Sequence, residues 1–126
     1  MKEIIYTESA PAAVGPYSQA TANETLLFVS GQLPIDPATG AFAADDVAGQ
    51  TRQCLENLSA ILEAGGSSLQ SVMKTTVYLK DISHFSMMNE VYASFFKENP
   101  PARAAFEVAN LPKGALVEIE AIAGRV

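Results

Sequence analysis

The chain has 126 residues, of which 48% are hydrophobic, and we expect residues 1–126 to form one domain with its own hydrophobic core. Eight Lys and Arg residues against 14 Asp and Glu residues give a formal net charge of −6. The basic residues are scattered along the chain, which argues against a nucleic-acid-binding protein, because such proteins need a basic stripe that follows the phosphates.

The cysteine content and the apolar segments indicate the cellular compartment in which the protein is expected. Cys54 is the only cysteine, so no internal disulfide can form, and this suits a reducing compartment. The N-terminus has no apolar stretch of signal-peptide length, and no segment reaches the roughly 18 apolar residues of a membrane-spanning helix. We therefore expect a soluble, cytoplasmic protein that does not enter a membrane.

The N-terminal third of the chain has the pattern of strands and turns. It predicts strands at residues 3–6, 17–22 and 26–32. Asn23-Glu24 makes a plausible tight turn between the second and third of these. The third strand is nearly all apolar, which is typical of a central position in a sheet. Residues 33–44 contain two prolines and a glycine and predict a loop.

The rest of the chain predicts two helices and three strands. Asp45 or Asp46 can cap a helix that runs to about residue 64, where Gly65-Gly66 ends it. Asp81 or Ser83 can cap a second helix, to about residue 97. Strands are predicted at residues 72–80, 103–108 and 115–123. The order β-β-β-α-β-α-β-β predicts an α+β fold, in which two amphipathic helices cover one face of one mixed sheet.

The second face of that sheet has an unusual composition. Two sets of side chains share a face by the strand period of two: Lys74, Thr76 and Tyr78 in one strand, and Leu116, Glu118, Glu120 and Ile122 in another. Arg103, Ala105 and Glu107 also share a face, and we expect them on the same surface. This surface is too apolar to be fully exposed to solvent and too charged to lie in an ordinary hydrophobic core. A subunit interface that contains a site would satisfy both features.

Arg103 and the two glutamates are the main candidates for chemistry. Arg103 follows two prolines, which stiffen the backbone, and its guanidinium matches a carboxylate through two parallel hydrogen bonds. The alternative is a structural ion pair. Glu118 or Glu120 in an apolar interface could have a raised pKa and act as a base or acid. One or both could instead pair with Arg103 or Lys74 and only hold subunits together.

Two further positions could contact a ligand. Tyr17 follows Gly15-Pro16 and could present its hydroxyl to a ligand, although packing in a core or interface is the commoner role. Ser30-Gly31-Gln32 ends the buried strand. Gly31 would let a ligand approach its backbone N–H closely, or it is simply a glycine in a bulge.

The remaining reactive residues do not form a known type of centre. Cys54 lies near the apolar stripe of a helix, which is typical of a buried, unreactive core residue. His84 is the only histidine. One His and one Cys cannot form a metal-ligand cluster, and the chain has no phosphate loop or dinucleotide fingerprint. We expect no metal and no cofactor.

Motifs spread over nearly the whole chain resemble the RidA (YjgF) family. They are Gly-Pro-Tyr-Ser-Gln-Ala (15–20), Val-Ser-Gly-Gln (29–32), Gln-Thr-Arg-Gln-Cys-Leu-Glu-Asn-Leu (50–58), Lys-Thr-Thr-Val-Tyr-Leu-Lys-Asp (74–81), Pro-Ala-Arg (101–103) and Leu-Pro-Lys-Gly-Ala-Leu-Val-Glu-Ile-Glu-Ala-Ile-Ala (111–123). The resemblance implies a chorismate-mutase-like fold and a homotrimer with three clefts between subunits. It also implies hydrolysis of 2-aminoacrylate, 2-iminopropanoate and 2-iminobutanoate to 2-keto acids and ammonia, which protects pyridoxal-phosphate enzymes from these reactive intermediates.

The resemblance also implies roles for individual residues. Arg103 would grip the substrate carboxylate, assisted by the N–H groups of Gly31 and Ala105. Glu118 would position the attacking water. Three further residues would line the cleft: Tyr17, Ser30 and Asn89. Many members carry Cys where this chain has Ala105. If that side chain is catalytic, this protein should be impaired; if only the backbone N–H is used, Ala serves equally well.

Other functions stay open from the sequence. The main alternative is a protein that binds 2-keto acids or other small carboxylates through Arg103 without turnover. RNA cleavage and a redox-activated chaperone activity are attributed to some relatives of the family. The charge of −6, the single His and the single Cys give neither of them support.

Overall fold

Six strands form one mixed sheet in the computed structural model, which describes residues 1–126. The main elements are β1 (Glu3–Ile5), β2 (Ala20–Ala22), β3 (Leu26–Gln32), α1 (Val47–Ala64), β4 (Val72–Leu79), α2 (Phe85–Phe95), β5 (Ala102–Glu107) and β6 (Val117–Gly124). The strand order is β1-β2-β3-β6-β4-β5, and only the β4–β5 pair is parallel. A parallel pair needs a crossover connection, which α2 provides.

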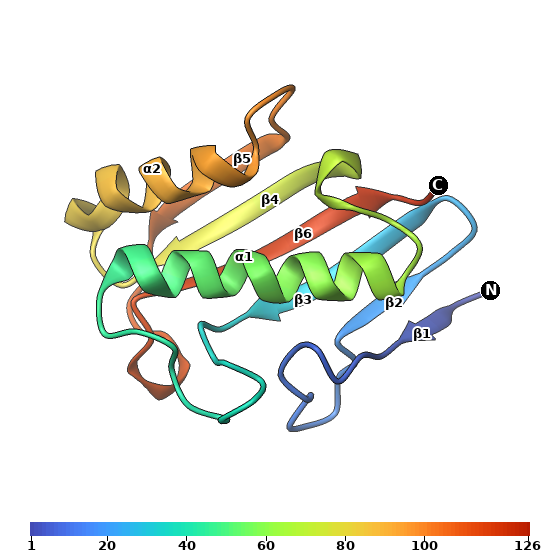
Figure 1. Cartoon of the computed structure of the whole chain (residues 1–126), viewed down its shortest axis with the longest axis horizontal. Helices are drawn as coiled ribbons and strands as arrows, with labels where there is room; N and C mark the ends of the chain where they lie inside the picture. The colour runs from blue at the N-terminus through green and yellow to red at the C-terminus, as the bar shows by residue number, and fades with distance from the viewer.

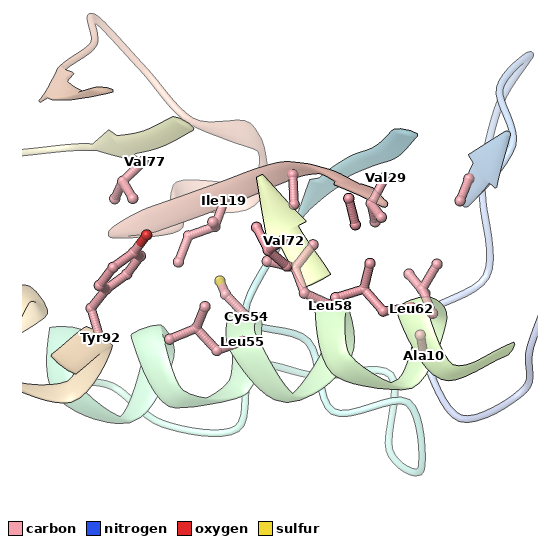
Figure 2. Close-up of a cluster of buried hydrophobic side chains, with 14 of the residues drawn as sticks. Ala10, Val29, Cys54, Leu55, Leu58, Leu62, Val72, Val77, Tyr92 and Ile119 are labelled. Carbon is pink, nitrogen blue, oxygen red and sulfur yellow. The ribbon is translucent and has the colours of Figure 1, made fainter. Parts of the chain in front are cut away.

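Both helices lie on the same face of the sheet (Figure 1), which confirms the predicted α+β architecture. The core lies between α1 and the central strands, where Cys54, Leu55, Leu58 and Leu62 point from the helix toward the sheet (Figure 2). Each of these side chains is almost fully buried. Burial of a Leu side chain stabilises the fold by about 1.5–3 kcal/mol, so this helix–sheet contact is a major source of stability. Neither helix has the length and apolar character needed to cross a membrane.

The ends of α1 follow the predicted capping chemistry. Asp46 is the N-cap, and its carboxylate accepts a hydrogen bond of 2.9 Å from the N–H of Gly49. The helix ends before Gly65, and Gly66 takes the left-handed conformation, with φ of 77°. Of the two aspartates that the sequence offered as caps, the structure selects Asp46.

Most predicted strands differ from the structure by one or two residues at their ends, and the larger differences are in the second strand and the second helix. The strand predicted at 17–22 is formed only by Ala20–Ala22, because Pro16 lacks an N–H and Tyr17 N bonds back to Gly15 O at 2.9 Å in a turn. Tyr17 therefore lies in a loop. The second helix begins with a 3-10 turn, η2 (Ile82–His84), capped by Asp81, and α2 ends at Phe95. Pro100-Pro101 disfavours helical geometry in the residues before it.

We predict that Asp46→Ala lowers the free energy of unfolding by about 1 kcal/mol, because the N–H of Gly49 then loses its side-chain acceptor. Equilibrium urea unfolding at fixed protein concentration measures the loss. Asp45→Ala is the matched control, and it should change the free energy by less than about 0.5 kcal/mol. Equal losses in the two variants would contradict the assignment of the cap.

Candidate functional site

Glu118 is the second residue of β6 and lies on the face of the sheet that the helices leave open. The register pairs it with Tyr78 of β4, and Glu120 pairs with Thr76. This confirms that these residues share a face, as the period of two predicts. Burial raises the pKa of the Glu118 carboxyl, and the negative charge of Glu120 raises it further. Glu118 forms no ion pair, so its carboxylate is free to take a proton from a ligand or water.

A β-bulge in β3 brings the backbone of Gly31 against Glu118. The register between β3 and β6 shifts between Val29 and Gln32, which leaves Ser30 and Gly31 opposite a single residue of β6. A Cβ atom built on Gly31 would lie 2.1 Å from Oε2 of Glu118. Only glycine therefore lets the carboxylate approach this closely. The Ser30 hydroxyl donates to Ser18 O at 2.6 Å, which ties the bulge to the loop that carries Tyr17.

Tyr17 and Gly31 line the same cavity, which has a volume of about 300 Å³. One wall is the loop after β1, which Gln19 holds by hydrogen bonds to the backbone of Thr7, Ala10 and Pro11. Tyr17 is half exposed, and its hydroxyl accepts a long hydrogen bond of 3.4 Å from Val14 N. We call Tyr17, Ser30, Gly31 and Glu118 the Glu118 cluster.

Arg103 lies in a different place, between β5 and α2. Its Nη1 donates to Asn89 Oδ1 at 2.7 Å. The guanidinium carbon lies 4.7 Å from the ring centroid of Tyr92 and 5.4 Å from that of Phe85. No carboxylate lies within ion-pair distance, since the one ion pair of the chain joins Arg125 and Glu3. A cavity of about 380 Å³ adjoins this group. We call Arg103, Asn89, Tyr92 and Phe85 the Arg103 cluster.

Ala105 places a backbone donor at the same edge of the sheet. β5 is the last strand and pairs only with β4. Val108 N donates to Leu79 O of β4 at 2.9 Å. Because successive N–H groups of a strand point to opposite edges, those of Arg103 and Ala105 point outward, away from β4. The Ala105 side chain packs against the core, so the N–H of this residue is the group that it presents at the open edge of the sheet.

The expectation that Arg103 and Ala105 share a surface with Glu118 is wrong. The register pairs Arg103 with Thr75, which is buried under the helices, whereas Glu118 pairs with Tyr78 on the open face. In β5 the open face is taken by Ala102, Ala104 and Phe106 instead. Within the single chain, neither Arg103 nor Lys74 forms an ion pair with Glu118 or Glu120, and such a pair between subunits stays a prediction. Within one chain, the two clusters lie on opposite faces of the sheet.

The open face itself is a mixed apolar and charged surface, as the sequence predicted. Phe28, Phe106 and Ile122 expose between 36% and 45% of their surface there. Tyr78 packs edge-on against Phe106, with ring centroids 5.5 Å apart. Exposed aromatic and aliphatic side chains around carboxylates are typical of a surface that another protein chain covers.

Sequence reasoning missed the aromatic part of the Arg103 cluster. Phe85 and Tyr92 belong to the apolar stripe of α2 and looked like ordinary core residues. The signal that could have found them is helical spacing: Phe85, Asn89 and Tyr92 stand four and three residues apart, so they lie on one side of the helix. Their contact with Arg103 depends on how α2 packs on β5.

Comparisons with known proteins agree on the family. The model of the family described as Endoribonuclease L-PSP matches residues 7–125. A RutC family protein of Pyrococcus horikoshii is 59% identical over 123 residues, which cover 98% of each chain. The human protein named 2-iminobutanoate/2-iminopropanoate deaminase is 46% identical over 98% of this chain and 90% of its own.

Solved structures of similar fold give the same result. The crystal structure of Escherichia coli TdcF with bound serine has a TM-score of 0.94 and 44% identity, over 98% of this chain and 99% of that one. Given this match and the family model, the chain belongs to the Endoribonuclease L-PSP family, which is the RidA (YjgF) family that its sequence resembles.

Proposed function

We propose that this protein hydrolyses reactive enamine and imine intermediates of the 2-iminopropanoate and 2-iminobutanoate type to 2-keto acids and ammonia. The observation that carries the proposal is the pair of clusters. One presents an arginine without a carboxylate partner, and the other presents a carboxylate with a raised pKa. The human relative is named as a deaminase of these two substrates, which supports the same reaction here.

Arg103 binds the carboxylate that all these substrates carry. Its guanidinium uses one donor on Asn89 and keeps the others for a ligand, so a bidentate contact is open to it. The outward N–H of Ala105 adds a donor at the same edge. We assign this role to the backbone and not to the side chain, so Ala in place of Cys at position 105 does not impair the site. The serine bound to TdcF is likewise an amino acid with a carboxylate.

Glu118 acts as the general base and general acid of the hydrolysis. The imine reacts with its nitrogen protonated. The oxygen of a water molecule bonds to the iminium carbon, the C=N π electrons move to nitrogen, and Glu118 accepts a proton from that water. Glu118 then passes this proton to the nitrogen, which gives a carbinolamine with a protonated amine. The C–N bond breaks, ammonia leaves with the bonding electrons, and the hydroxyl oxygen forms the C=O bond of the keto acid while Glu118 takes up the hydroxyl proton. Burial and the charge of Glu120 raise the pKa of Glu118, which makes its carboxylate a stronger base than that of an ordinary glutamate.

The proposal includes a homotrimer in which each cleft combines the two clusters of different subunits. Arg103 and Glu118 lie on opposite faces of one chain, so a second copy must supply the partner group. The apolar open face gives each copy a surface to bury against the next. A closed ring of three equal contacts leaves no such surface exposed.

Binding of small carboxylates without turnover is the alternative that the Arg103 cluster also supports. Cleavage of RNA, which the family name suggests, finds less support. The net charge is −6, and neither cluster gathers the several basic side chains that a phosphate backbone requires.

We predict that Arg103→Ala lowers kcat/KM for 2-iminopropanoate by about 100-fold or more, because the carboxylate loses a charge-assisted bidentate partner. The imine is generated in situ by an amino-acid oxidase, and pyruvate or ammonia release is measured above the uncatalysed rate. Arg52→Ala, which removes an exposed arginine of α1, is the matched control and should leave the rate unchanged.

The variant Glu118→Gln separates catalysis from simple binding. It should lower the rate by about 100-fold or more and leave the affinity for pyruvate, measured by calorimetry, close to that of the wild type. If the wild-type protein binds pyruvate but does not accelerate imine hydrolysis, the deaminase proposal fails and the binding alternative replaces it.

Mixing two inactive variants tests the shared clefts. When Arg103→Ala and Glu118→Gln subunits are unfolded together and refolded as mixed trimers, about a quarter of the clefts receive one intact Arg103 and one intact Glu118. Activity should therefore return to about a quarter of the wild-type value, although each variant alone is inactive. No recovery, in a sample shown by mass spectrometry to contain mixed trimers, would rule out clefts shared between subunits.

The raised pKa of Glu118 predicts the pH dependence. Activity should rise with pH as Glu118 loses its proton, and Glu120→Gln should move this rise to lower pH by removing the neighbouring charge.

The stability of the folded protein should change with pH in the opposite sense. The folded protein holds this proton more tightly than the unfolded chain, so the free energy of unfolding falls as pH rises from 4.5 to the raised value. Carboxyl-carbon NMR titration and urea unfolding between pH 4 and 8 measure both effects, and an ordinary pKa for Glu118 would contradict them.

A further inference from the structure

Tyr92 makes a second, independent set of contacts around Arg103. Its ring lies nearly buried between α2 and the sheet, with 5% of its surface exposed. The guanidinium of Arg103 lies over one part of this ring at 4.7 Å. The ring of Phe96 packs against Tyr92 with centroids 4.7 Å apart. The aromatic ring under Arg103 is therefore itself held by its neighbours.

A buried hydrogen bond fixes the far end of the Tyr92 side chain. The Tyr92 hydroxyl and Thr75 Oγ1 are 2.7 Å apart, and Thr75 is fully buried in β4. Thr75 is also the register partner of Arg103 in the neighbouring strand. Each of the three residues Arg103, Thr75 and Tyr92 thus contacts the other two. Backbone pairing joins Arg103 to Thr75, the buried hydrogen bond joins Thr75 to Tyr92, and the cation–π contact joins Tyr92 to Arg103. Burial raises the pKa of Tyr92, so its hydroxyl stays protonated around neutral pH.

We propose that Tyr92, anchored by Thr75, is a positioning residue that orients the Arg103 guanidinium toward the ligand before the ligand binds. This role rests on the proposed function only in that Arg103 is the group that binds the carboxylate. Asn89 and Phe85 complete the support, from one and two turns earlier in α2.

Aromatic support is the form of support that a carboxylate-binding arginine needs. A partner carboxylate would also hold the guanidinium, but it would occupy the same donors and neutralise the charge that attracts the ligand. A ring face attracts the cation without using any N–H donor. An Arg side chain that is already ordered also loses less conformational entropy when the ligand binds.

The first test measures the position of the Arg103 guanidinium relative to the Tyr92 ring and does not depend on activity. The chain has three arginines, Arg52, Arg103 and Arg125, so the Nε–H signal of Arg103 can be assigned in a 1H–15N spectrum by its loss in Arg103→Ala. In the wild type this signal should show the upfield ring-current shift of a proton over an aromatic face. Tyr92→Leu should remove most of the shift. The double variant Thr75→Val/Tyr92→Phe keeps the ring but removes the hydrogen bond that anchors it, so its shift should lie between those of the wild type and Tyr92→Leu.

The second test reads the consequence for binding. Tyr92→Leu should raise the KM for 2-iminopropanoate and the Kd for pyruvate by about tenfold, with a smaller change in kcat. Thr75→Val/Tyr92→Phe keeps the ring and loses only its anchor, so it should raise KM and Kd by a smaller factor, about threefold. Val91→Ala is the control for a general loss of packing, since Val91 is a buried residue of α2 that lines a different cavity from the one beside Arg103. It should lower thermal stability and leave KM and Kd unchanged.

A double-mutant cycle decides whether Tyr92 acts through Arg103. In an Arg103→Ala background, Tyr92→Leu should weaken pyruvate binding no further. The proposal is overturned if Tyr92→Leu keeps the wild-type Kd, if its effect adds fully to that of Arg103→Ala, or if the Nε–H shift is absent in the wild type. A ring-current shift in a protein that neither binds pyruvate nor hydrolyses imines would instead refute the proposed function and leave the orientation of Arg103 by Tyr92 standing.

Discussion

The packing of both helices on one face of the six-stranded sheet is the constraint on which the other features of this protein depend. Side chains of a strand alternate between the two faces, so each strand contributes one set to the helix-covered core and another to the open face. In β6 the covered set is Val117, Ile119 and Ala121, and the open set includes Glu118 and Glu120. A carboxylate pair in mid-sheet is tolerated because it faces away from the core.

The two clusters solve different physical problems. Arg103 must keep a positive charge and free donors in a place that is partly buried, and aromatic rings provide this better than an ion pair would. Glu118 must keep a carboxyl that can gain and lose a proton, and partial burial next to a second carboxylate provides this. If these groups faced each other in one chain, they would form a salt bridge that lowers the pKa of Glu118 and occupies Arg103. Within one chain the two groups lie on opposite faces of the sheet, so they do not pair with each other.

Backbone geometry contributes as much to the candidate site as side chains do. The bulge at Ser30-Gly31 lets the Glu118 carboxylate lie against a residue without a Cβ atom. The free edge of β5 directs the N–H of Ala105 outward. A backbone donor does not depend on the side chain, so the small Ala105 is compatible with this arrangement. We therefore expect substitutions to be tolerated least at Gly31, Arg103 and Glu118.

The sequence by itself determined the order of the elements, the two amphipathic helices and the shared face of Tyr78, Glu118 and Ile122, because these follow from local periodicity and turn chemistry. Its motifs also identified the family. It could not determine that Arg103 lies under α2, since a one-residue change in the register of β5 against β4 would move that side chain to the other face. Only the tertiary structure decided this register, the bulge that joins Gly31 to Glu118, and the packing of Tyr92 on Arg103. Each of these depends on contacts between segments that are distant in the chain, and such contacts leave no periodic pattern in the sequence.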